Sequence, residues 1–236
     1  MNVELLTASL PALAAGSWLT LQLVALGVTF GSAVALPVAL ARVARRAWLR
    51  WPAVAYIGFF RGTPLLVQIF LIYYGSGQFR AAFEAIGLWA VLREAYWCAV
   101  IAFALNTSAY TAEILRGGIA AVPRGEIEAA RALGLKPAIV YGRVVLPLAF
   151  RLALPAYGNE VIIMLKASAL VSTIALVDLM GAARAIYSRT FTLEVYVYAA
   201  LLYGVATVIV GWVVGWAERR WRVDFSPRPA ARNRRK

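Results

Sequence analysis

The chain has 236 residues, of which 62% are hydrophobic, with a net charge of +13 and a mean hydropathy of +0.73. A soluble domain is usually nearer half apolar, so this composition favours a membrane protein. The chain lacks histidine, the usual general base and metal ligand, and its single cysteine, Cys98, can form no intrachain disulfide. No P-loop pattern occurs. We therefore expect no catalysis, no metal site and no ATP binding on this chain.

Five long apolar stretches predict five membrane-spanning helices. A helix needs roughly 20 residues to cross a bilayer, and the third stretch reaches that length once residues 112–115 are added. The first ten residues carry Glu4 and no basic residue, so they do not resemble a cleaved signal, and we expect the first span to remain as an anchor. The stretches are residues 16–41, 51–75, 95–111, 152–180 and 195–217.

The placement of basic residues predicts the orientation. They are dense in the first and third connections and in the tail, and sparse in the second and fourth. Because basic residues gather on the cytoplasmic side, we expect an external N-terminal segment at 1–15, a membrane domain at 16–218 and a cytoplasmic tail at 219–236. Anionic lipid explains the basic tail better than nucleic acid does, because no soluble domain is left to present a groove. The first and third connections contain Arg42, Arg45, Arg46, Arg50, Arg116, Arg124, Arg131, Lys136, Arg143 and Arg151.

The second span contains a run that breaks helices. Residues 60–68 read F-R-G-T-P-L-L-V-Q, and Thr63 before Pro64 has the pattern of an N-cap followed by the first helical position. The span is therefore predicted to consist of two helical pieces joined at Arg61 and Gly62.

Three polar residues of the third span, Asn106, Tyr110 and Glu113, fall on one helical face. For Asn106 and Ser108 we favour hydrogen bonds between helices over substrate binding. Glu113 and Arg116 are three residues apart near the inner surface and are predicted to form a local ion pair.

A polar segment between the third and fourth spans predicts a helical hairpin on the membrane surface. Residues 124–133 are good helix formers, and Gly134 can adopt a positive φ that ends the first helix. Pro137 suits the first turn of a second short helix reaching Leu146, and Pro147 is expected to set the entry to the next span. The small residues Ala129 and Ala130 keep one side of the first helix narrow, so that it can settle into a groove on a partner. Glu128 can pair with a basic group there.

Glu160 is the main candidate for a substrate-binding residue. It lies among apolar residues of the fourth span, where an ionisable side chain is a functional hypothesis by default. The alternative is a buried pair with an arginine of a neighbouring helix. Lys166, about 240° around the helix, is not expected to pair with it. Asp178 is predicted to lie five turns further along the same helical face, near the outer surface. Its predicted role there is a contact for incoming cargo, a plain N-cap or a surface charge. The residues sharing the face of Glu160 are Met164, Ala167 and Val171.

The hairpin segment resembles a known family. Residues 128–147 read E-A-A-x3-G-x9-V-x-L-P, similar to the E-A-A-x3-G-x9-I-x-L-P coupling loop of permease subunits in type I ABC importers, with Val144 in place of Ile. The resemblance implies the permease fold of that class, with the coupling loop at about 117–147. It also implies a contact with a separate ATP-binding subunit through Glu128, Ala129, Ala130, Gly134 and Pro147.

Other segments are similar to the polar amino-acid branch of that family. Residues 60–68 and 106–119 resemble it, and residues 159–170, N-E-V-I-I-M-L-K-A-S-A-L, resemble M-type subunits of histidine and arginine systems, which work as heterodimers. In relatives that transport arginine, this glutamate and an aspartate after the lysine bind the basic side chain. Ala167 stands in place of that aspartate here. The shared helical face and the resemblance together make Glu160, Asn159, Met164 and Ser168 the predicted substrate-binding residues.

The sequence thus predicts a multi-pass permease subunit in a bacterial inner membrane, moving an amino acid inward by alternating access. The cargo is predicted to be basic, and a neutral polar amino acid or an opine is the alternative. A channel or membrane-scaffold protein is the alternative of a different class. The expected partners are an ATP-binding subunit dimer, a second permease subunit, identical or different, and a periplasmic solute-binding protein.

Overall fold

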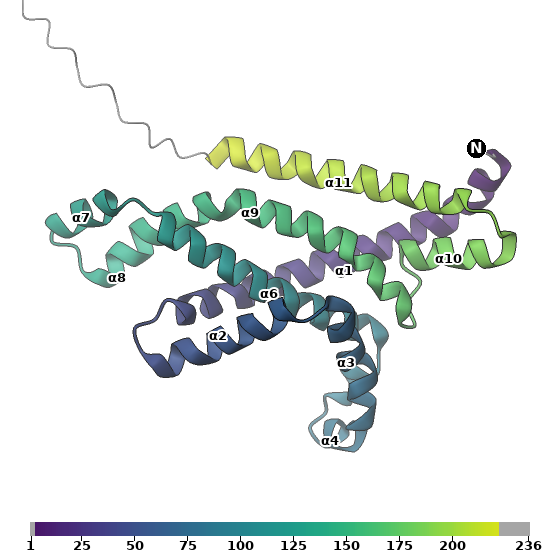
Figure 1. Ribbon diagram of the computed structural model, residues 1–236, viewed down its shortest axis with the longest axis horizontal. Helices are drawn as coiled ribbons and strands as arrows, with labels where there is room; N and C mark the ends of the chain where they lie inside the picture. The colour runs from purple at the N-terminus through teal and green to yellow at the C-terminus, as the bar shows by residue number, and fades with distance from the viewer. Residues whose placement is uncertain (1–2, 222–236) are drawn as a thin grey trace, which may run out of the picture.

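The computed structural model describes residues 3–221, and every regular element in that range is a helix (Figure 1). Four helices are long and apolar enough to cross a membrane, and a pair bent by 102° makes a fifth span if it counts as one. The predicted all-α protein of about five spans is confirmed. The tail residues 222–236 lie outside the described range. The elements are α1 (Val3–Arg42), α2 (Ala47–Gly62), α3 (Leu65–Gln78), α4 (Arg80–Ala85), α5 (Trp89–Leu92), α6 (Ala95–Ala121), α7 (Arg124–Ala132), α8 (Pro137–Val140), the π-helical turn η1 (Tyr141–Val145), α9 (Leu146–Ala167), the 3-10 helix η2 (Ser168–Thr173), α10 (Leu179–Thr190) and α11 (Glu194–Trp221).

The first helix is longer than the sequence indicated. α1 begins at Val3 rather than near residue 16 and continues to Arg42. It makes its most extensive contact with α6. Gly31 allows this close approach, because a Cβ atom there would lie 2.8 Å from both the carbonyl oxygen of Ala104 and the Cβ of Thr107. A larger residue would push the two helices apart.

The second span is broken as predicted, but its cap lies one residue later. Pro64 is the N-cap residue of α3, and its carbonyl accepts hydrogen bonds from the backbone N–H groups of Val67 and Gln68. The prediction that Thr63 is the N-cap was therefore wrong. Its extended backbone (φ −113°, ψ 144°) suits a residue before proline, and its hydroxyl donates back to the Phe59 carbonyl at 2.8 Å.

The fourth span differs from its prediction at its start. α8, η1 and α9 form one uninterrupted run, so the second loop helix does not end at Leu146. Pro147 has no N–H to bond to the carbonyl of Arg143. The chain accommodates this loss with the π-helical turn, in which the Leu146 N–H donates to the Tyr141 carbonyl five residues back.

The span also ends earlier than predicted. α9 stops at Ala167, η2 follows, and the backbone is extended at Ile174. Asp178 consequently does not continue the face of Glu160. It is the N-cap of α10, where its carboxylate accepts from the Gly181 N–H at 2.9 Å. Of the three predicted roles, the N-cap is confirmed, and the carboxyl is fully buried rather than a surface charge. Burial raises the pKa of the Asp178 carboxyl, and hydrogen bonds from Gly181, Met180 and Tyr203 oppose that rise.

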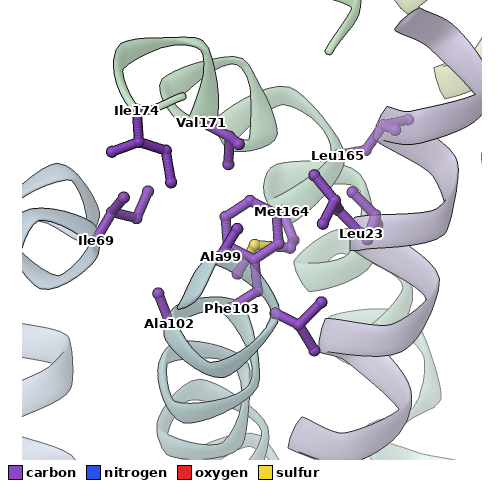
Figure 2. Close-up of a cluster of buried hydrophobic side chains, with 11 residues drawn as sticks. Leu23, Ile69, Ala99, Ala102, Phe103, Met164, Leu165, Val171 and Ile174 are labelled. Atoms are coloured by element: carbon purple, nitrogen blue, oxygen red, sulfur yellow. The ribbon is translucent and has the colours of Figure 1, made fainter. Parts of the chain in front are cut away.

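The largest apolar core lies where α1, α3, α6 and the end of α9 meet (Figure 2). Phe103 of α6 is fully buried there and packs beside Met164 of α9. Because η2 folds back over this core, it adds Val171, followed by Ile174. The labelled side chains of the cluster are Leu23, Ile69, Ala99, Ala102, Phe103, Met164, Leu165, Val171 and Ile174.

The two ends of the helical bundle carry different elements. α7 and α8 lie at the end where α11 finishes, and α10 lies at the opposite end beside the start of α1 (Figure 1). α3 and α4 project from the side of the bundle. The hairpin that joins α6 to α9 is thus separated from α10 by the length of the bundle.

Candidate functional site

The break between α2 and α3 is closed by two amide side chains. Helices that end inside a membrane need partners for their free carbonyl groups. The Gln68 amide nitrogen lies within hydrogen-bond distance of the carbonyl oxygens of Phe60 (2.9 Å) and Thr63 (3.1 Å). Asn106 of α6 donates to the Gln68 side-chain oxygen at 3.0 Å. The predicted interhelical hydrogen bonding of Asn106 is confirmed. Gln68, the last residue of the F-R-G-T-P-L-L-V-Q run, is needed at this position because its amide closes the break.

A cavity of about 490 Å³ opens beside this break. Glu160 of α9 lies in its wall and is only 5% exposed. Arg61 lines the same cavity from the end of α2, with its guanidinium carbon 5.2 Å from the centre of the Tyr110 ring. No ion pair within 4.0 Å joins Arg61 to Glu160, so the described residues leave both charges available to a ligand. The lining residues are Arg61, Gly62, Thr63, Pro64, Leu65, Asn106, Tyr110, Glu160, Ile163, Met164 and Ala167.

The predicted substrate-binding residues divide between two environments. Met164 lines the cavity together with Glu160, as their common helical face predicts. Asn159 is exposed elsewhere on α9 and is not among the lining residues. Ser168 is buried at the start of η2, and its hydroxyl donates to the Leu165 carbonyl at 2.7 Å. The geometry thus brings together only two of the four residues.

Sequence reasoning missed Arg61 and Tyr110 as site residues. Both belong to segments that the sequence had singled out, but their meeting depends on how α2 crosses α6. The predicted local pair of Glu113 with Arg116 is confirmed at 2.6 Å. Ser108 is confirmed as an interhelical contact, hydrogen bonded to the hydroxyl of Tyr56 on α2.

The hairpin between α6 and α9 ends its first helix as predicted. Gly134 has φ +75°. Its N–H donates to the Arg131 carbonyl at 2.9 Å, and the Leu135 N–H donates to the Ala130 carbonyl at 3.3 Å. These two bonds form a Schellman motif, which needs a left-handed residue at the position of Gly134. The turn thereby sets the angle at which α7 leaves the hairpin.

The predicted coupling residues face different ways. Ala130 is 6% exposed and packs in a small core with Val140 and Val145, so its small side chain lets α7 approach its own chain. Glu128 and Ala129 are exposed on the outer surface of α7. Pro147 is exposed at the start of α9. The surface available to a partner is therefore formed by Glu128 and Ala129, with Gly134 setting their position.

An apolar tip on the hairpin was not predicted. Leu133 is 79% exposed directly before Gly134, and Leu135, Ile139 and Tyr141 are also exposed. An exposed apolar patch beside a turn is typical of a docking surface rather than of a free loop.

Within residues 3–221, no group of three histidine, cysteine, aspartate or glutamate side chains could hold a metal ion.

The chain is similar to known transport proteins over most of its length. The family model described as the binding-protein-dependent transport system inner membrane component matches residues 27–223. The nopaline transport system permease protein NocM of Agrobacterium fabrum is 45% identical over 219 residues, covering 92% of this chain and 91% of NocM. The histidine/lysine/arginine/ornithine transport system permease protein HisM of Escherichia coli is 39% identical over 213 residues, or 90% of each chain.

A solved structure gives the same picture. One chain in the crystal structure of an amino acid ABC transporter with histidines is 39% identical in sequence to this chain. The two structures match with a TM-score of 0.83 over 93% of this chain and 99% of that chain. The predictions of the type I importer permease fold, of a permease subunit and of a multi-pass protein in a bacterial inner membrane are confirmed. The chain belongs to the family of binding-protein-dependent transport system inner membrane components.

Proposed function

We propose that this permease subunit moves a basic amino acid or an opine inward through the cavity at the α2–α3 break. The observation that carries the proposal is Glu160, a carboxylate 5% exposed in the wall of a 490 Å³ cavity. Cavities of about 300–1,000 Å³ suit small ligands. A buried carboxylate with no basic partner within 4.0 Å is costly, and a cationic substrate would offset that cost.

The guanidinium of Arg61 adds a second condition on the substrate. A ligand that reaches both Glu160 and Arg61 must carry a cation and a carboxylate. Basic amino acids have both groups, and opines carry further carboxylates. The named cargoes of NocM and HisM, nopaline for one and histidine, lysine, arginine and ornithine for the other, fall in these two classes. This support covers both cargoes and does not favour a neutral polar amino acid.

The mechanism that fits the fold is alternating access driven by a separate ATPase. ATP-binding subunits would dock on Glu128, Ala129 and the apolar tip at Leu133, and their closure would move the hairpin. The hairpin continues through η1 directly into α9, which carries Glu160. A displacement at the docking surface therefore has a continuous helical path to the cavity. A second permease subunit and a solute-binding protein would complete the importer.

Reconstitution tests this function. We expect proteoliposomes containing this chain, its permease partner and ATP-binding subunits that face the lumen to accumulate arginine or nopaline only with ATP in the lumen and the solute-binding protein outside. The ATP-binding subunits should also co-purify with the chain. Downhill flux without ATP or ATPase subunits would instead identify a channel. Uptake of neutral amino acids alone would reject the cargo but not the importer.

The orientation gives a separate prediction. α1 begins and α11 finishes at opposite ends of the bundle (Figure 1), and the basic residues of the first and third connections lie toward the hairpin end. We expect the N-terminus outside and the C-terminus in the cytoplasm. A reporter active only in the periplasm should work when fused before residue 3 and fail when fused after residue 236. The opposite pattern would mean inverted insertion.

A further inference from the structure

The first helix is too long for the bilayer. Trp18 is 64% exposed and marks an interfacial position. From Trp18 to Arg42 the helix covers about 36 Å, which suits a hydrocarbon core of about 30 Å and its interface. A further fifteen residues precede Trp18, so α1 continues about 22 Å beyond the interface. Under the proposed orientation, this extension points outward.

The extension is not isolated, because two other helices pack on it. A second apolar core joins Leu13 of α1 to Leu179 and Ala183 of α10 and to Val195 of α11. Leu5 packs against the same core near the start of α1. We call the assembly of residues 3–17, α10 and residues 194–199 the outer platform. It has a core of its own beyond the level of Trp18.

The base of the outer platform is fixed to α1 and α11. The Leu179 N–H donates to the Thr20 hydroxyl at 3.1 Å, and the Tyr203 hydroxyl contacts the buried Asp178 carboxylate at 3.4 Å. α10 extends from this base for twelve residues, about 18 Å, beside the first part of α1 (Figure 1). Under the proposed orientation, its far end therefore lies beyond the level of Trp18 on the outer side.

A strained aromatic residue occupies that far end. Phe191 has φ +52° and ψ 23°, a left-handed conformation that is unusual for a bulky residue. Asparagine or glycine would make this turn with less strain. The Phe191 side chain is also 77% exposed, and Leu193 beside it is 67% exposed. Strain and exposure of an apolar residue in water both cost free energy, and such outliers point to a function.

A positive charge completes the surface. Arg189 is exposed in the last turn of α10, one residue before its end, and forms no ion pair within 4.0 Å with any other described residue. An exposed aromatic beside an arginine is the composition of a protein-binding hot spot. Contact with lipid does not account for these exposed side chains, because under the proposed orientation the outer platform holds them beyond the membrane surface.

We propose that the tip of the outer platform, formed by Phe191, Leu193 and Arg189, is a surface on which the permease receives its solute-binding protein. The family is binding-protein-dependent, so a partner on the outer side is required. Phe191 inserts into an apolar depression on that protein, and an acidic group there faces Arg189. This inference rests on the proposed importer function and orientation, and it names the residues of one contact.

The test measures binding of the cognate solute-binding protein to the complete transporter in nanodiscs. Phe191→Asn keeps the left-handed turn and removes the ring, and Arg189→Glu reverses the charge on an exposed helical surface. Each should raise Kd by about tenfold, the loss typical of one interface anchor. Arg189→Glu should also weaken the dependence of the association rate on salt. Ile86→Asn is the matched control, because Ile86 is 66% exposed at the end of α4, away from the platform.

The outcomes separate the alternatives. Unchanged affinity in both variants would overturn the surface while wild-type uptake still supports the importer. Equal weakening by Ile86→Asn would overturn the assignment to the platform. A wild-type protein that shows no ATP-driven uptake would reject the proposed function itself. Phe191→Asn should leave the thermal stability unchanged or higher, and a lower stability with normal binding by Arg189→Glu would make Phe191 structural.

Discussion

Replacing Gly134 by valine is expected to abolish uptake while the protein remains in the membrane. Gly134 has φ +75°, and no atom lies within 4 Å of a Cβ built there. The penalty therefore comes from the backbone and not from a collision. A left-handed conformation costs an L-residue roughly 1–2 kcal/mol, and more when the side chain is β-branched. Valine would relieve that strain by unwinding the Schellman turn, which would move Glu128 and Leu133 away from the ATPase.

Two further variants separate the turn from side-chain size. Gly134→Asn should retain most of the uptake, because asparagine tolerates a left-handed backbone. Gly125 lies in α7, the helix that ends two residues before Gly134, and it has open space around its Cβ position and no positive φ. Gly125→Val should therefore lose much less activity. Uptake and stimulated ATPase activity are measured together for each variant. Normal transport with stimulated ATPase activity in Gly134→Val would show that the turn does not transmit force.

The hairpin turn was predictable from the sequence because its cause is local. A glycine after a run of helix formers, followed by Pro137, specifies the end of α7 without help from distant residues. The same local reasoning located the break at Arg61 and Gly62. It failed at Pro147, because a proline is compatible both with the start of a new helix and with a helix that continues through a π-helical turn. The packing of Val145 and Ala149 under α7 favours the continuous helix.

Two further features depend on distant contacts and could not be predicted. α10 is short and carries Arg184 and Arg189, so no apolar stretch signals it. It is stabilised by Leu13 and by the cap at Asp178. The cavity likewise needs the crossing of α2, α6 and α9. Sequence periodicity placed Glu160 and Met164 on one face, but only the fold brings Arg61 and Tyr110 opposite that face.

Glu160→Gln is expected to lower uptake of arginine, lysine and histidine by roughly tenfold or more, since hydrogen bonds to charged groups contribute about 1.5–3 kcal/mol. Glutamine keeps the shape of the side chain and its packing against the cavity wall, so assembly with the ATP-binding subunits should not change. Arg61 would remain without a neighbouring carboxylate, and binding of a carboxylate-rich opine should fall less than binding of a basic amino acid.

Lys166→Gln is the matched control for that prediction. It removes one charge from the same helix six residues later, but Lys166 lines a different cavity, beside Tyr203 and Thr207. Because the solute-binding protein also selects cargo, ligand binding must be measured on the assembled transporter without it, alongside uptake. If Glu160→Gln binds and transports every basic amino acid as the parent does, Glu160 is structural. The cavity at the α2–α3 break would then serve a neutral solute, or the partner permease would hold the cationic site. If instead only Glu160→Gln loses the basic cargo, the buried carboxylate is the residue that selects it.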